Sequence, residues 1–93
     1  MLKVYHAVDP KFGMGEVKQE FPADYELVAT VETASVEEAF RLTNHIDGDW
    51  RYNEGVKPTE LARRSTSVGD IVVDMNGRIW ECASCGWTER GAA

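Results

Sequence analysis

The chain of 93 residues contains only two cysteines and no apolar run long enough to cross a membrane, which takes about 18 residues. Two cysteines are too few for the disulfide framework of a small secreted domain. The first residues, MLKVYHAVDP, also lack the apolar core of a signal peptide. We therefore expect a soluble protein that stays in the cytoplasm and contacts no membrane.

Basic residues are scarce: ten Lys and Arg stand against sixteen Asp and Glu, which gives a net charge of −6. A protein that tracks nucleic-acid phosphates needs a basic face, so this balance argues against that general class. The acidic residues are scattered along the chain rather than grouped in a tail. A protein partner fits this pattern better than a nucleic acid.

Strand and helix signals follow one another along a chain whose length suits one small domain, residues 1–93. Residues 2–8 and 25–33 alternate in polarity, as half-buried strands do. Ser35 stands three residues before Glu38, which is the spacing of a capping box. A helix is therefore expected from Val36 to Ile46, with its apolar arc on a sheet.

The last expected unit is a β-hairpin around Asn76-Gly77, the preferred sequence for a two-residue type I′ turn. That turn pairs Val73 with Trp80 and Ile71 with Cys82, and places these four residues on the core face. The order strand, strand, helix, strand, strand predicts an α+β fold. Its mostly antiparallel four-stranded sheet would carry one main helix on one face.

Cys82 and Cys85 have the spacing of half a zinc site. The other half is not visible, because neither His6 nor His45 belongs to a histidine pair with metal-ligand spacing. Structural thiols, a zinc site and a redox pair all stay open. The first is favoured because the expected register turns Cys82 inward. We expect no cofactor, with zinc as the alternative.

Ser65, Thr66 and Ser67 supply hydroxyls that a histidine could activate, but no nucleophile-elbow motif surrounds them. A polar turn whose hydroxyls bond neighbouring amides is the simpler interpretation. His6 lies on the apolar face of the first strand and is expected to be a hydrogen-bonded core residue. The sequence therefore predicts no catalytic residue and a protein that is not an enzyme.

The only local mixture of basic and aromatic residues begins at Trp50 and Tyr52. Such a mixture can anchor a protein partner or stack on bases. The alternative is a loop whose aromatic side chains fold back over the helix. Together with the last tryptophan, the predicted contact residues are Trp50, Arg51, Tyr52, Arg63, Arg64 and Trp87.

Three segments, VEEAFRLTNHID, RSTSVGDIVV and Gly86-Trp87, occur in this order, with Trp50 and Asn53 between the first two. Residues 64–70 are their most specific part. Over about residues 36–87 the chain resembles the YodL-like group of small proteins encoded by phages, plasmids and integrative elements. The resemblance implies a mobile-element setting and carries over no catalytic residue.

Small accessory proteins of such elements commonly bind another protein, so by analogy this chain is expected to bind a host or element-encoded protein. A defence nuclease complex in the host cytoplasm is one such target, and binding would then inhibit it in an anti-CRISPR-like way. The alternative is a nucleic-acid-associated module that uses the basic-aromatic loop and is stabilised by zinc.

Overall fold

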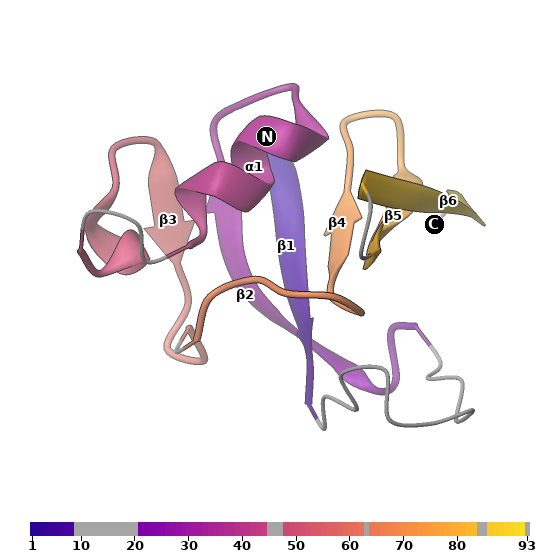
Figure 1. Cartoon of the computed structure of the whole chain (residues 1–93), viewed down its shortest axis with the longest axis horizontal. Helices are drawn as coiled ribbons and strands as arrows, with labels where there is room; N and C mark the ends of the chain where they lie inside the picture. Colours follow the sequence, from indigo (N-terminus) through magenta and orange to yellow (C-terminus); the bar gives the residue numbers. More distant parts are fainter. Residues whose placement is uncertain (9–20, 45–47, 63, 84–85, 93) are drawn as a thin grey trace.

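A six-stranded antiparallel sheet with one short helix on one face forms the body of the protein (Figure 1). The computed structural model describes residues 1–8, 21–44, 48–62, 64–83 and 86–92. The strands lie in the order β3-β2-β1-β4-β5-β6. The elements are β1 Leu2–Ala7, β2 Tyr25–Val31, α1 Val36–Leu42, the 3-10 turn η1 Trp50–Tyr52, β3 Val56–Pro58, β4 Ile71–Val73, β5 Arg78–Ala83 and β6 Gly86–Ala92.

The predicted four-stranded sheet is wrong, although the α+β class holds in broad terms. The two additional strands, β3 and β6, form the two edges of the sheet. β3 has only three residues and ends at Pro58, so it is too short to show a period. β6 begins at a glycine, has another near its end, and changes register along β5, which hides its alternation.

Helix α1 begins as predicted and ends earlier than predicted. Ser35 caps the helix, because its hydroxyl accepts a hydrogen bond from the Glu38 amide at 3.2 Å. The return contact of a capping box is replaced by an ion pair between Glu38 and Arg41. At the other end, the Thr43 hydroxyl donates to the Ala39 carbonyl at 2.8 Å, which satisfies a terminal carbonyl and ends the helix after Leu42.

The β4–β5 hairpin lies where it was predicted, but its register is shifted by one residue. The reversal has three residues instead of two, since the Asp74 amide donates to the Arg78 carbonyl at 2.9 Å. Gly77 has φ +80° and the Gly77 amide donates to Asp74 O at 3.0 Å, as in a type I turn followed by a bulge. The Asp74 carboxylate stabilises this turn by accepting from the Asn76 and Arg78 amides.

This shift changes which residues share a face. Val73 lies opposite Ile79 and Val72 lies opposite Trp80, so the predicted grouping of Ile71, Val73, Trp80 and Cys82 on one face is wrong. Trp80 instead shares the helix face with Val72, and its indole N–H donates to Asp74 at 3.0 Å. Cys82 is nevertheless buried.

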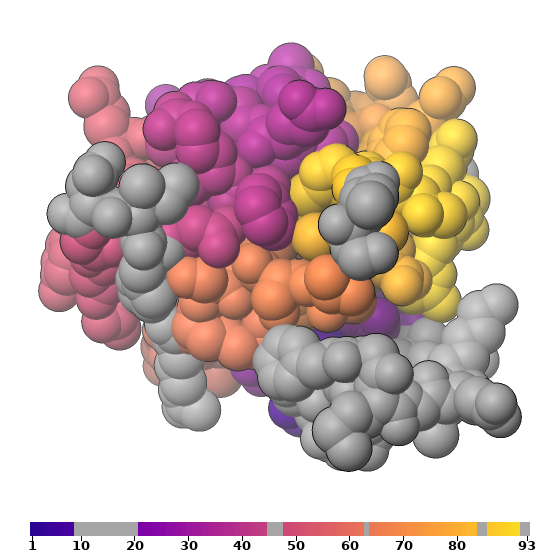
Figure 2. All heavy atoms as spheres, viewed as in Figure 1, coloured from indigo at the N-terminus to yellow at the C-terminus, as the bar shows by residue number. Residues whose placement is uncertain are grey.

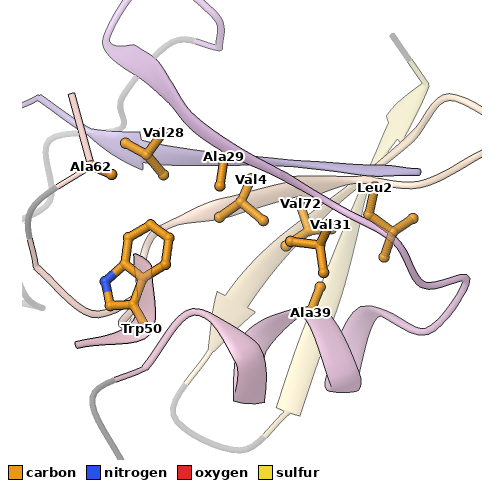
Figure 3. Close-up of a cluster of buried hydrophobic side chains, with 9 residues drawn as sticks. All are labelled: Leu2, Val4, Val28, Ala29, Val31, Ala39, Trp50, Ala62 and Val72. Carbon is orange, nitrogen blue, oxygen red and sulfur yellow. The ribbon is translucent and has the colours of Figure 1, made fainter. Parts of the chain in front are cut away.

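Apolar side chains are buried on both faces of the sheet. The helix face carries the larger cluster, shown in Figure 3: Leu2, Val4, Val28, Ala29, Val31, Ala39, Trp50, Ala62 and Val72. The opposite face carries Ile71, Val73 and Ile79 under three aromatic rings. A bulge in β2 puts Tyr25 on that opposite face, although simple alternation would place it with Ala29. In Figure 2, α1 and the segment that leads to β4 together cover much of the helix face.

Candidate functional site

Residues 64–70, the most specific part of the resemblance, fold around the carboxylate of Asp70. Asp70 is 1 % exposed and forms a two-pronged ion pair with Arg64, at 2.6 and 2.8 Å. The amides of Ala7 and Ser67 also donate to Asp70, at 2.9 and 2.8 Å. A buried anion needs this many donors to offset its lost hydration. The motif therefore ties the segment before β4 to the end of β1.

His6 belongs to a second buried network, which joins β1 to the end of α1. Its Nε2 lies 2.8 Å from the Thr66 hydroxyl, which in turn lies 2.7 Å from the Thr43 hydroxyl. Thr43 gives its single proton to the Ala39 carbonyl, so Thr66 donates to Thr43 and His6 Nε2–H donates to Thr66. Each donor in this network thus has an acceptor, in the order His6, Thr66, Thr43 and the Ala39 carbonyl. His6 is a hydrogen-bonded core residue, as predicted.

The geometry around His6 does not fit a nucleophile and its base. Thr66 is 2 % exposed, and its hydroxyl proton is used by Thr43. Asp70 lies 3.9 Å from the same nitrogen that bonds Thr66, whereas a triad carboxylate holds the opposite ring nitrogen. Burial lowers the pKa of His6 to about 4, against a partial rise from Asp70 and a further lowering from Arg64. These contacts are those of a neutral structural histidine.

Cys82 carries the part of the predicted zinc site that lies within the described residues, while Cys85 and His45 lie outside them. Cys82 is 6 % exposed, and burial, with Asp70 and Glu81 nearby, raises the pKa of its thiol to about 11. A metal ligand or redox centre needs the thiolate. Within the described ranges, no group of three or more His, Cys, Asp or Glu side chains is arranged to hold a metal ion.

The predicted contact residues do not gather on one surface. Trp50 is fully buried, and its indole N–H donates to the Arg64 carbonyl at 2.8 Å. Trp87 is half-buried and packs edge-on against Phe40, with ring centres 5.8 Å apart. Arg64 belongs to the Asp70 network, and Arg63 lies outside the described residues. Trp50 is therefore a core residue and not part of a contact surface.

Tyr52 and Arg51 are the predicted residues that face solvent. Tyr52 is 84 % exposed, the highest value among the large apolar side chains of the described ranges. Arg51 is also exposed and is paired with Asp49, which caps η1. Trp50 lies in the core two residues earlier, so the short turn of η1 directs Tyr52 outward from an anchored residue.

A groove of about 550 Å³ lies between α1 and the turn that leads into β3, and the first residue of that turn in its lining, Asn53, directly follows Tyr52 in the chain. Asn53 holds the two walls together, because its side-chain amide donates to the Leu42 carbonyl at 2.8 Å. The Glu32 amide donates to the Gly55 carbonyl at 2.8 Å and joins the end of β2 to the turn before β3. The lining residues are Glu32, Thr33, Glu38, Arg41, Leu42, Asn44, Asn53, Glu54 and Gly55.

The groove has more negative than positive charge. Three glutamates, Glu32, Glu38 and Glu54, line it with a single arginine, Arg41. Arg41 is paired with Glu38, and this hydrogen bond lowers the pKa of the Glu38 carboxyl. The sequence reasoning missed this site because its acidic residues come from three separate segments. Their only sequence signal was the scattered acidity of the chain.

Comparisons with known proteins add no relative: no family model, curated protein or solved structure matches the chain. The resemblance to the YodL-like group therefore stays a prediction from the quoted segments. Across the described ranges, no helix is long and apolar enough to pass through a bilayer.

Proposed function

We propose that this chain is a small non-enzymatic accessory protein that binds another protein through Tyr52 and the adjoining groove. The observation that carries the proposal is the contrast between Trp50, which is fully buried, and Tyr52, which is 84 % exposed on the same short turn. Exposed tyrosines on rigid supports lose little entropy on binding and often dominate interface energies. The exposed side chain of Tyr52 contributes little to the core, so a role in binding accounts for its position better than a role in folding.

The charges of the groove favour a partner that presents lysine or arginine side chains. Glu32, Glu38 and Glu54 outnumber Arg41, and the whole chain carries −6. Complementary charges raise association rates and select partners. Nucleic-acid-binding proteins of a host, defence nucleases included, carry such basic surfaces. We therefore keep a host or element-encoded protein, in the host cytoplasm, as the proposed partner, with inhibition of a defence nuclease as its specific form.

The nucleic-acid alternative has less support. Its basic residues include Arg64, which is paired with the buried Asp70, and Arg51, which is paired with Asp49. Binding a phosphate there would compete with an intramolecular carboxylate at each position. A mobility shift at low salt that disappears on Arg51→Ala substitution would revive this alternative.

Site-specific photo-crosslinking tests the proposal. A photoreactive phenylalanine derivative at position 52 should capture one partner protein in host cells. The same group at Met75, which is 64 % exposed on the distant hairpin, should not capture it. With the purified partner, Tyr52→Ala should weaken binding about 30-fold, as expected for an aromatic hot spot worth about 2 kcal/mol, whereas Met75→Ala should change it less than twofold.

The outcome that contradicts the proposal is equal capture from both positions, or equal affinity of the Tyr52→Ala and unmodified proteins. If the partner is a defence nuclease, expression of the unmodified protein should also restore plating of a targeted phage. Tyr52→Ala should lose this effect at an unchanged level of folded protein.

A further inference from the structure

The two edges of the sheet differ in how they are protected. β3 has three residues and includes Lys57 and Pro58, two devices that prevent another strand from pairing with an edge. β6 has seven residues, and Thr88 and Glu89 in its middle are exposed. Among the strands that the structure describes, none pairs with its outer side. Among the residues that the structure describes, one edge is therefore protected and the other is open.

The backbone groups that face this open edge can be identified from the neighbouring ladder. Both backbone groups of Cys82 bond the β4 side, because its amide donates to Asp70 O and its carbonyl accepts from Gly69 N–H, each at 2.8 Å. Strand groups alternate in direction, so the groups of Glu81 face β6 and bond its partner Thr88. It follows that the amides and carbonyls of Trp87 and Glu89 point outward from the edge.

Two copies of this edge fit each other in antiparallel orientation. With Thr88 on the two-fold axis, Trp87 of one copy would face Glu89 of the other, and the four outward residues would exchange hydrogen bonds. Centring the axis on Glu89 instead would oppose two like charges, which is unfavourable. The Thr88-centred register also sets two β-branched threonines side by side, a favourable cross-strand pair. The open edge is thus self-complementary.

We propose that β6 pairs with β6 of a second copy to form a symmetric dimer with a continuous twelve-stranded sheet. Two sheets of six strands joined edge to edge give this number. Such an isologous contact closes on itself, so it yields dimers and not fibres. The interface is small, hence we expect a dissociation constant on the order of 10 μM or weaker. The dimer leaves Tyr52 free and does not depend on the proposed function.

A pair of substitutions at one position separates the backbone from the side chain. Glu89→Pro removes an outward amide but leaves the Glu81–Thr88 pairing with β5 intact. Glu89→Ala also loses the ion pair with Arg78 but keeps the amide. Analytical ultracentrifugation should cover protein concentrations of about 5 to 500 μM, a range of two decades that includes the expected dissociation constant. It should show dimers for the unmodified and Glu89→Ala chains. Glu89→Pro should weaken dimerisation at least tenfold while its circular dichroism stays native.

A cysteine at the axis gives an independent measurement. Threonines in a pair that is not hydrogen-bonded have Cα atoms about 4.5 Å apart, within the range of a disulfide. Under mild oxidation Thr88→Cys should form a disulfide that joins position 88 of one copy to position 88 of the other, identified by peptide mass spectrometry. Thr88→Ser should form no such link. A monomer at all concentrations, a dimer unaffected by Glu89→Pro, or no link at position 88 would each overturn the proposal.

Discussion

Two loop segments on the helix face, residues 50–55 and 64–70, each contain one arginine that is paired with an aspartate, and the two segments have opposite roles. Segment 64–70 turns inward: Arg64 is paired with the buried Asp70, and Thr66 joins His6 to Thr43. Segment 50–55 anchors itself with Trp50 and displays Tyr52. The difference teaches that a buried anion determines the role of an arginine, and that composition alone does not.

The largest expected effect on this comparison comes from Asp70→Asn. The amide has nearly the same shape but cannot neutralise Arg64, and its single oxygen can accept from only one of the two main-chain donors, the N–H groups of Ala7 and Ser67. Breaking such a buried pair should reduce the free energy of unfolding by about 3 kcal/mol or more. Urea denaturation measures this change. Glu54→Gln, at an exposed position, should stay within about 0.5 kcal/mol, and an Asp70→Asn midpoint equal to the original would contradict the inward role of segment 64–70.

A smaller loss of stability should occur on acidification, because His6 becomes protonated. Its folded pKa of about 4 lies below the ordinary value of 6.5, so the unfolded chain takes up a proton first as pH falls. The stability that neutral His6 provides is therefore complete above pH 6.5 and is lost progressively between pH 6.5 and 4. Between pH 7 and 5 the loss should be about 2 kcal/mol.

His6→Gln provides the control for this pH dependence, because glutamine keeps a donor and does not titrate. At pH 7 the variant should be less stable than the original, and the difference between the two should shrink toward pH 5. Urea unfolding at pH 7, 6 and 5 follows both proteins. Parallel stability curves would show that His6 is accessible to protons in the folded protein.

The smallest effect on stability should come from Tyr52→Ala, whose side chain is mostly in solvent. We expect a change within about 0.5 kcal/mol. Thermal denaturation of the purified protein is sufficient to measure it. A loss above about 2 kcal/mol, the size expected for a core residue, would mean that Tyr52 supports the fold, and it would blur the distinction between the two segments.

The sequence predicted local features well and long-range ones poorly. The Ser35 cap, the buried His6 and the position of the β4–β5 hairpin depend on neighbouring residues or simple alternation. The predicted register of that hairpin was wrong because the side chain of Asp74 stabilises a three-residue reversal, whereas Asn-Gly favours a two-residue turn. One side chain thus moved Trp80 to the other face.

The candidate site was predicted only in part, for a similar reason. Tyr52 was identified from local composition, but the burial of Trp50 depends on packing against β1 and β2. The pairing of Arg64 with Asp70 depends on a sharp turn at Gly69, which has φ +95°. The groove combines residues from 32 to 55, and β6 shows no alternation because a bulge interrupts it. Such juxtapositions arise only when the whole chain folds.

The three residues of β4 pack on both faces of the sheet. Val72 packs under the helix, while Ile71 and Val73 belong to the cluster of aromatic rings behind it. A displacement of this strand cannot be confined to one side, since turning one residue turns its neighbours the opposite way. A shift of β4 on the helix side would therefore also move Ile71 and Val73 in the cluster on the opposite face of the sheet.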